Sequence, residues 1–196
     1  MERKTIYLCL AHMSEEGLEQ KYVKEAFDTN WVVPMGPNVN AFEQALSDFA
    51  NTNSDGSKLN HKVVCLSAGT AAVHLALIAC GVKPGDEVCV QSFTFCASSH
   101  PITYLGAKPV FIDSERETWN MDPELLEKAI IDRKEKTGQY PKAIIPVALY
   151  GMPYDCEKIM AIANKYDIPV IEDAAEGLGS RFNGQVLGTF GRFGVC

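Results

Sequence analysis

Apolar and polar positions of residues 62–196 form a pattern that predicts strands separated by amphipathic helices. Short runs rich in branched side chains are typical of strands buried on both faces. They lie at about residues 62–66, 87–91, 108–112, 142–148 and 168–172. Helical spacing fills the intervals at about residues 70–81, 96–106, 122–136 and 155–166, where Pro101 should kink its helix or mark a late start. This alternation predicts an α/β fold with three layers, α/β/α, and a mostly parallel sheet.

The first sixty residues have a different pattern of apolar positions. Their apolar positions predict one helix at residues 14–29 and another from Asn38 or Asn40 to about Phe49. A polar loop then covers residues 51–60. We therefore expect a helical arm, residues 1–60, that packs on an α/β domain, residues 61–196.

Near the end of the chain, Asn183-Gly184 predicts a two-residue hairpin turn within residues 181–187.

Charge and composition exclude several classes of protein. The chain has 196 residues, 46% of them hydrophobic, which is enough for one sizeable core. Its 18 basic and 25 acidic residues give a net charge of -7, whereas nucleic-acid binding needs clustered basic charge. No apolar run approaches the ~20 residues of a membrane span, and Thr5–Leu10 is too short for a signal-peptide core. We expect a cytoplasmic protein that binds neither nucleic acid nor membrane.

Cysteine and histidine residues indicate no metal site. The seven cysteines include no C-x-x-C pair, and the four histidines lack metal-ligand spacing. We interpret the cysteines as reduced thiols, most of them in the core.

Two carboxylates, Glu172 and Asp173, end the last buried strand. The carboxyl ends of parallel strands are where open α/β sheets bind ligands. An unpaired carboxylate is costly to bury, so we expect Asp173 to face a cation, a metal or a proton-bearing ligand atom.

Two further strand ends carry candidate ligand groups. The segment S-A-G-T-A-A (67–72) leads into a helix, so Gly69 and Thr70 could hold a phosphate at the helix start, or Ser67 and Thr70 could be ordinary N-caps. It lacks both the P-loop lysine and G-x-G-x-x-G. In Q-S-F-T-F-C-A-S-S (91–99), Phe95 could stack on a planar ligand or fill the core.

Taken together, these three strand ends match a planar, phosphorylated, cationic heteroaromatic molecule. Pyridoxal 5'-phosphate (PLP) has all three properties. Its phosphate would lie at the helix start, its ring against Phe95 and its protonated ring nitrogen against Asp173. Because the carboxylate keeps this nitrogen protonated, the ring can act as an electron sink.

The segments 67–77, 85–97, 171–180 and 187–191, with 36–43 upstream, resemble the DegT/DnrJ/EryC1/StrS family of PLP-dependent sugar aminotransferases. This family belongs to the aspartate-aminotransferase superfamily (fold type I). The resemblance implies transfer of an amino group from glutamate to a nucleotide-linked keto sugar, for amino sugar and polysaccharide biosynthesis. It also implies a homodimer with active sites at the subunit interface.

By position, the resemblance assigns Gly69 and Thr70 to the phosphate, Phe95 to the ring face and Asp173 to the ring nitrogen. Glu176 is assigned a place near the ring hydroxyl. Many relatives carry Gln or His there, and a carboxylate would be repelled unless it is protonated or turned away. We therefore expect burial and like charge to raise the pKa of Glu176. Ala148 stands where relatives commonly carry His, so we expect no side-chain contact from that position.

The family's Schiff-base lysine follows G-T-F-G by a few residues, and the sequence ends at Cys196 before that point. The resemblance therefore implies the N-terminal part of a longer enzyme, without the lysine and the small C-terminal domain. Such a chain would be inactive alone, with weak or absent PLP binding. Two alternatives stay open: a PLP-dependent sugar dehydratase with His in place of lysine, and a non-catalytic regulatory relative, which the intact Asp173 disfavours.

Overall fold

The computed structural model describes residues 13–196, and the Thr5–Leu10 run considered above lies outside the described residues. Contacts divide the chain into two compact units, Met1–Phe42 and Glu43–Cys196. Among the described residues, no helix is long and apolar enough to cross a membrane.

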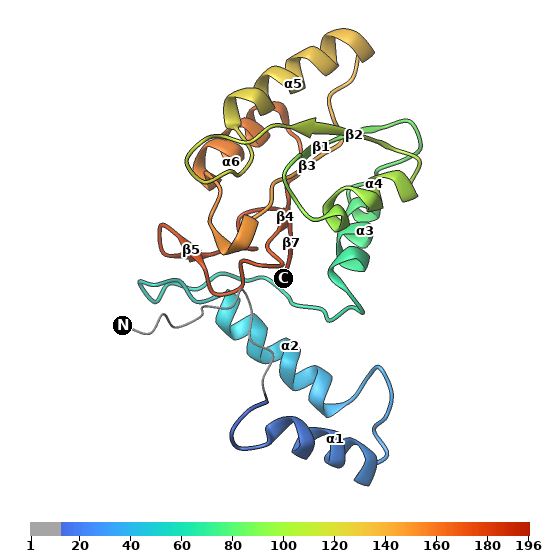
Figure 1. Ribbon diagram of the computed structural model, residues 1–196, viewed down its shortest axis with the longest axis vertical. Coiled ribbons are helices and arrows are strands. Elements are labelled where there is room, and N and C mark those ends of the chain that lie inside the picture. Colours follow the sequence, from blue (N-terminus) through green and yellow to red (C-terminus); the bar gives the residue numbers. More distant parts are fainter. Residues whose placement is uncertain (1–12) are drawn as a thin grey trace, which may run out of the picture. The chain divides into compact units, whose positions relative to one another are not determined.

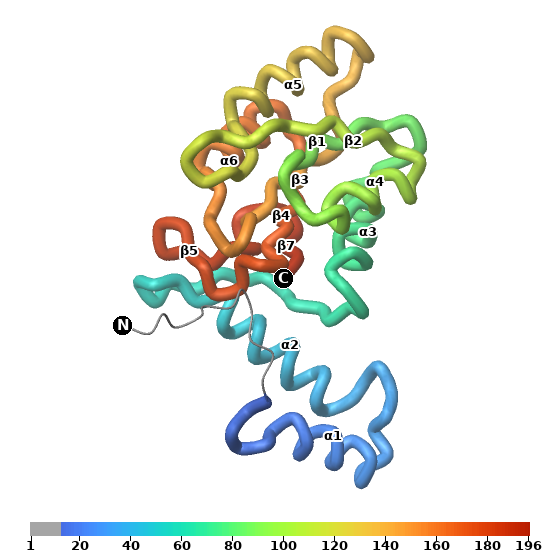
Figure 2. The backbone as a smooth tube through the Cα atoms, viewed as in Figure 1, coloured from blue at the N-terminus to red at the C-terminus, as the bar shows by residue number. Residues whose placement is uncertain are grey.

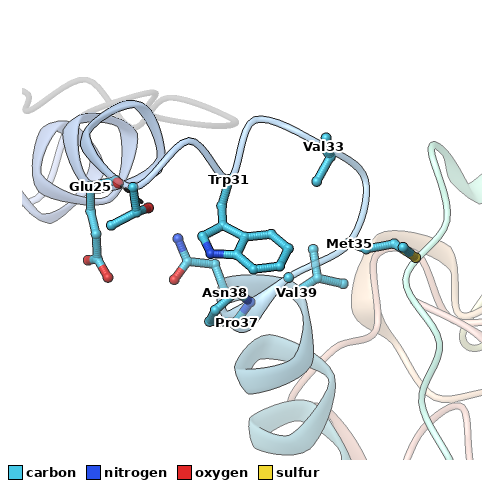
Figure 3. A pocket seen from close by; sticks show the side chains of 9 residues that line it. Glu25, Trp31, Val33, Met35, Pro37, Asn38 and Val39 are labelled. Atoms are coloured by element: carbon cyan, nitrogen blue, oxygen red, sulfur yellow. Dashed lines mark hydrogen bonds between the residues drawn. The ribbon is translucent and has the colours of Figure 1, made fainter.

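The first unit contains helix α1 (Leu18–Asp28) and the beginning of α2 (Pro37–Ala50). Ser14 caps the start of α1, because its hydroxyl oxygen accepts the Leu18 N–H at 2.8 Å. The connection between the helices folds over Gly36, where an added Cβ would lie 2.9 Å from the Trp31 ring. Figure 3 shows the Trp31 indole beside Asn38 and Val39, in a small pocket of this connection.

The second unit is built on parallel strands. Strand β1 (Glu87–Gln91) pairs with β2 (Lys108–Ile112) and with β3 (Ala143–Ile145). Strand β4 (Ile171–Asp173) pairs with β7 (Phe193–Val195). Bridges from Ile144 to Val170 and from Val147 to Asp173 join β3 to β4. The strand order is therefore β2-β1-β3-β4-β7, all parallel (Figure 1).

Helices cover both faces of this sheet (Figure 2). One face packs on α5 (Pro123–Thr137) and α6 (Cys156–Tyr166), and the other on α3 (Gly69–Ala79) and α4 (His100–Tyr104). Alternation along β1 explains the two cores, since Cys89 lies in the first and Val88 and Val90 lie in the second. The predicted three-layer α/β/α fold is confirmed.

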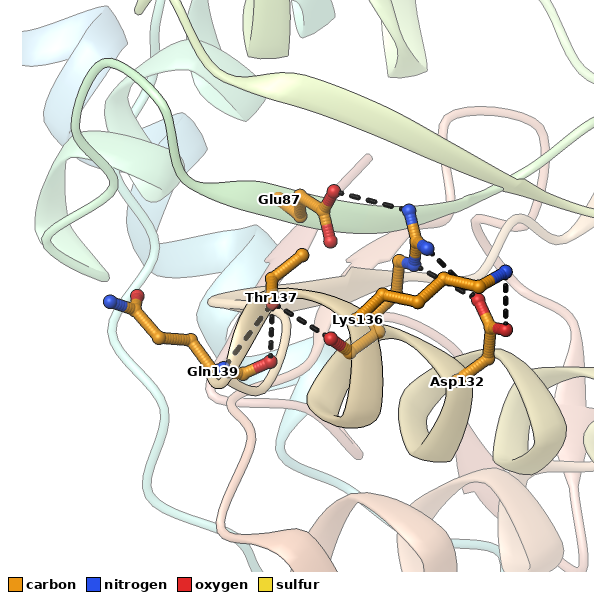
Figure 4. A network of polar contacts seen from close by, with 6 residues as sticks. Glu87, Asp132, Lys136, Thr137 and Gln139 are labelled. Atoms are coloured by element: carbon orange, nitrogen blue, oxygen red, sulfur yellow. Dashed lines mark hydrogen bonds and ion pairs between the residues drawn. The ribbon is translucent and has the colours of Figure 1, made fainter.

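An ion-pair network links helix α5 to the first residue of β1. Arg133 lies 3.4 Å from Glu87 and 3.0 Å from Asp132, which also pairs with Lys136 at 2.7 Å. Figure 4 shows this network at the end of α5, where the Thr137 hydroxyl also bonds to backbone groups. Because Arg133 and Glu87 are partly buried, their pair connects helix to sheet more firmly than a fully exposed pair would.

The hairpin predicted at Asn183-Gly184 is confirmed. Strands β5 (Arg181–Phe182) and β6 (Gln185–Val186) are antiparallel, and both turn residues have positive φ, 48° and 86°. Two positive φ values are the type I′ geometry that these residues favour.

The strand predicted at residues 62–66 is wrong. Side chains in and just after α2, not a neighbouring strand, hold this segment: Glu43 of α2 accepts the Cys65 N–H at 2.8 Å, and Asn51, which follows α2, donates to the His61 carbonyl at 2.8 Å. Val64 and Leu66 are exposed. A strand needs backbone pairing, which no described segment gives to these residues.

Other boundaries also differ from the prediction. The strand predicted at 142–148 covers only β3, Ala143–Ile145. The helix predicted at 96–106 is a 3₁₀ turn, η1 (Cys96–Ser98), followed by α4, which starts late because Pro101 occupies its first turn. The last predicted strand starts at Ile171 rather than 168. Residues 43–60 belong to the second unit, where Arg181 donates to the Thr52 carbonyl at 2.9 Å.

Candidate functional site

Asp173 is the last residue of β4, and its side chain is only 7% exposed. Its Oδ2 accepts the Ser98 hydroxyl at 2.6 Å, and its Oδ1 accepts the Ala175 N–H at 3.3 Å. The backbone is held too, because Asp173 N–H donates to Pro146 and its carbonyl accepts from Ala148, both at 3.0 Å. The carboxylate is therefore fixed in orientation, and an ionised carboxylate has more lone pairs than these two bonds use.

Ser98 is a site residue that the sequence analysis missed. It is fully buried in η1, and its oxygen lies 2.8 Å from the Thr94 hydroxyl. Its N–H donates to the Phe95 carbonyl at 3.1 Å, so Phe95 lies within one turn of the partner of Asp173. The available signal was a serine three residues after the candidate aromatic, in the segment that follows the strand predicted at 87–91.

Gly69 begins α3, with Ala68 at the N-cap and no side-chain cap bond. The alternative that Ser67 or Thr70 caps this helix is therefore wrong. The first-turn N–H groups of an uncapped helix are available to an anion, and the helix dipole favours negative charge there. Gly69 also lies against the last strand, since an added Cβ would be 3.7 Å from Val195. The helix start and the carboxyl end of β7 are thus neighbours.

Phe95 is 78% exposed, so the alternative that it fills the core is wrong. Its ring has a free face on the same edge of the sheet as Ser98 and Asp173. An exposed aromatic face in this position can stack on a planar ring.

Glu176 is exposed, and its Oε2 accepts the Tyr150 N–H at 2.6 Å. The expected burial of Glu176 is therefore wrong, and its carboxylate is instead turned toward the backbone of the β3–α6 connection. Gly151 packs beside it, since an added Cβ would meet the Glu176 carbonyl at 2.9 Å. Ala148 is buried in the core.

Glu172, the other carboxylate of the pair, is buried and holds the loop before β7. It accepts N–H groups of Gly188 at 3.1 Å, Phe190 at 2.5 Å and Gly191 at 2.7 Å. Burial raises the pKa of Glu172 above its ordinary value, although the three N–H groups oppose the shift. Burial beside this carboxylate also raises the pKa of the Cys156 thiol to about 12. Glu172 therefore has a structural role, distinct from that of Asp173.

The assembled edge offers an uncapped helix start, an exposed aromatic ring and an oriented carboxylate. Such a set suits an anionic group, a flat ring and a protonated ring nitrogen on one molecule. Among residues 13–196, no three His, Cys, Asp or Glu side chains are grouped so that they could hold a metal ion.

The mostly parallel sheet and its covering helices are consistent with part of the large α/β domain of fold type I, the class to which similar solved aminotransferase structures belong. The chain belongs to the DegT/DnrJ/EryC1/StrS aminotransferase family, whose family model matches residues 13–196.

Three comparisons illustrate the relationship. EpsN of Bacillus subtilis (strain 168) is 48% identical over 192 residues, which are 98% of this chain and 47% of EpsN. GDP-perosamine synthase of Caulobacter vibrioides is 40% identical, over 90% of this chain and 43% of that protein. The structure of NtdA from Bacillus subtilis with bound cofactor PMP, the amino form of PLP, has a TM-score of 0.73 at 32% identity, covering 85% of this chain and 35% of NtdA. The chain thus spans less than half the length of these relatives.

Replacing Ser98 with Ala should lower the free energy of unfolding by about 1–3 kcal/mol, because the buried carboxylate of Asp173 loses its shortest hydrogen bond. Urea unfolding of the chain measures this change. Ser99→Ala is the matched control, since its hydroxyl makes only a 3.3 Å bond to the Cys96 carbonyl. Equal stability of the two variants would contradict the role of Ser98.

Replacing Glu172 with Gln should change how stability depends on pH. Because the folded-state pKa of Glu172 is raised above 4.5, the folded chain binds this proton more tightly than the unfolded chain. The stability of the wild type should therefore fall, relative to Glu172→Gln, as pH rises from about 4 through the folded-state pKa. Urea unfolding across this range measures it, with exposed Glu157→Gln as the charge control. If the stability of the wild type relative to Glu172→Gln stays constant or rises with pH, the raised pKa of Glu172 is refuted.

Proposed function

We propose that this chain is the N-terminal, cofactor-binding part of a PLP-dependent aminotransferase. The enzyme would transfer an amino group from glutamate to a keto sugar carried on a nucleotide. Family membership supports this proposal, and the observation that carries it is the buried carboxylate of Asp173, oriented by Ser98 at the carboxyl edge of the sheet.

The described residues fit PLP by their chemistry. The uncapped first turn of α3, with Gly69 and Thr70, would bind the phosphate. The exposed ring of Phe95 would lie against the pyridine ring and orient it. Asp173 would hold the proton on the ring nitrogen, and Ser98 would hold Asp173. When bound, PLP supplies an electron sink for negative charge that develops beside the transferred nitrogen.

Glu176 would contact the cofactor differently from the Gln or His that many relatives carry at this position. Its carboxylate accepts a charge-assisted hydrogen bond from the Tyr150 N–H. This bond would keep the carboxylate from facing the ring hydroxyl while fixing the β3–α6 connection beside the cofactor.

The catalytic lysine is proposed to lie beyond Cys196, in the part of the relatives that this chain does not span. We therefore propose that the 196 residues alone bind PLP weakly or not at all and have no transferase activity. We further propose a cytoplasmic homodimer as the working state of the complete protein.

The test replaces Asp173 with Asn in the complete protein that carries this chain. Glutamate is supplied, and the release of 2-oxoglutarate is measured in a single turnover. Loss of one partner of a buried charged pair costs about 3–5 kcal/mol, so the rate should fall about 10²–10⁴-fold.

Asp132→Asn, on the exposed side of α5, is the control and should keep the wild-type rate. An Asp173→Asn rate within threefold of the wild type would refute the assignment of Asp173. A wild-type protein that releases no 2-oxoglutarate would refute the aminotransferase itself.

A further inference from the structure

Three loops at the carboxyl edge of the sheet carry large exposed aromatic side chains. Phe93 follows β1, Trp119 lies in the β2–α5 connection and Tyr150 lies in η2 (Leu149–Gly151) after β3. Their exposed fractions are 48%, 60% and 69%. The Phe93 and Trp119 rings meet edge to face, with centroids 6.1 Å apart. We call these three residues the aromatic rim.

Two rim residues have strained backbone. Trp119 and Tyr150 have φ of 65° and 51°, in the left-handed region that bulky residues rarely adopt. The other non-glycine residues with positive φ among the described ones are Asn30, Asp167 and Asn183, whose short polar side chains tolerate this region. Strain of this kind persists where surrounding structure enforces it, and it clusters at ligand-binding sites.

A buried pair of amide side chains enforces this geometry. Gln91 donates to the Phe93 carbonyl at 2.9 Å and accepts the Met121 N–H at 2.8 Å. Asn120 donates to the Met152 carbonyl at 3.0 Å and accepts the Leu149 N–H at 3.1 Å. The two amides are themselves 3.4 Å apart. Every bond runs to the backbone of a rim loop, so the pair fixes all three loops relative to one another.

The rim adjoins the proposed cofactor site without overlapping it. Phe93 is two residues before Phe95. The Tyr150 N–H donates to Glu176, and the neighbouring Ala148 N–H donates to the Asp173 carbonyl. A substrate whose reacting carbon lies beside Asp173 would extend its remaining part over this adjoining surface.

We propose that the aromatic rim binds the nucleobase of the nucleotide-linked substrate, with Gln91 and Asn120 as positioning residues. The inference rests on the proposed function and names its substrate contact. A nucleobase is the flat, π-faced part of such a substrate, and it stacks on exposed aromatic rings. The sugar would not occupy the aromatic rim, because its keto carbon must lie beside the cofactor at Asp173.

The test measures binding of GDP and UDP to the complete protein by titration calorimetry. Trp119→Gly relieves the strained φ and therefore keeps the fold, while it removes the ring. Loss of a stacked ring should weaken the better-bound nucleotide about tenfold. Phe93→Ala is a second variant at unstrained backbone, and the same weakening is expected.

Tyr104→Ala is the matched control. Tyr104 is 59% exposed and also forms an edge-to-face pair, with His74 at 5.7 Å, but on regular helices away from the rim. The Tyr104→Ala variant should bind the nucleotide with the same affinity as the wild type. Gln91→Ala should weaken nucleotide binding as Trp119→Gly does, with a raised KM for the nucleotide-linked sugar and a smaller change in kcat.

Failure of the inference and failure of the proposed function give different results. If neither GDP nor UDP binds the wild type, or if Trp119→Gly and Phe93→Ala bind them as tightly as the wild type, the nucleobase site is refuted. Release of 2-oxoglutarate from glutamate by the same wild-type preparation would then leave the aminotransferase standing. If that release is absent, the proposed function fails by itself.

Discussion

The hydrogen bond from Ser98 to Asp173 is the constraint on which the rest of the site depends. It joins residues 75 positions apart, from the loop after β1 and the tip of β4. A buried carboxylate without a partner would be costly, so this bond makes Asp173 tolerable before any ligand arrives. Because the Ser98 N–H donates to the Phe95 carbonyl, the same turn links the backbone of Phe95 to the partner of the carboxylate. Orientation is thus built into the fold.

The two consecutive carboxylates of β4, Glu172 and Asp173, have different roles. Successive side chains of a strand point to opposite faces, so Glu172 and Asp173 cannot share an environment. Glu172 gathers three backbone N–H groups and shapes the loop before β7, whereas Asp173 faces the edge with Ser98. The Gln91–Asn120 pair has a similar role to Glu172, because these buried side chains also hold loops by hydrogen bonds to their backbone. Polar groups of the interior therefore shape this edge of the sheet.

Local pattern was enough to predict part of this architecture. Strands β1 and β2 and the hairpin at Asn183-Gly184 were predicted correctly because branched runs and turn residues specify them locally. Residues 62–66 have the same strand-like composition but no pairing partner among the described residues, which composition does not reveal. Asp173 was predictable as a strand-end carboxylate, whereas Ser98 and Asn120 act through contacts with distant residues and left only a weak sequence signal.

In the proposed enzyme, Asp173 would meet a protonated ring nitrogen of PLP. Nitrogen-15 NMR of the complete protein loaded with PLP labelled at the ring nitrogen measures that protonation state directly. We predict a protonated ring nitrogen at neutral pH in the wild type and a deprotonated one in Asp173→Asn. An unprotonated ring nitrogen in the wild type, or one whose protonation is unchanged by Asp173→Asn, would contradict the account.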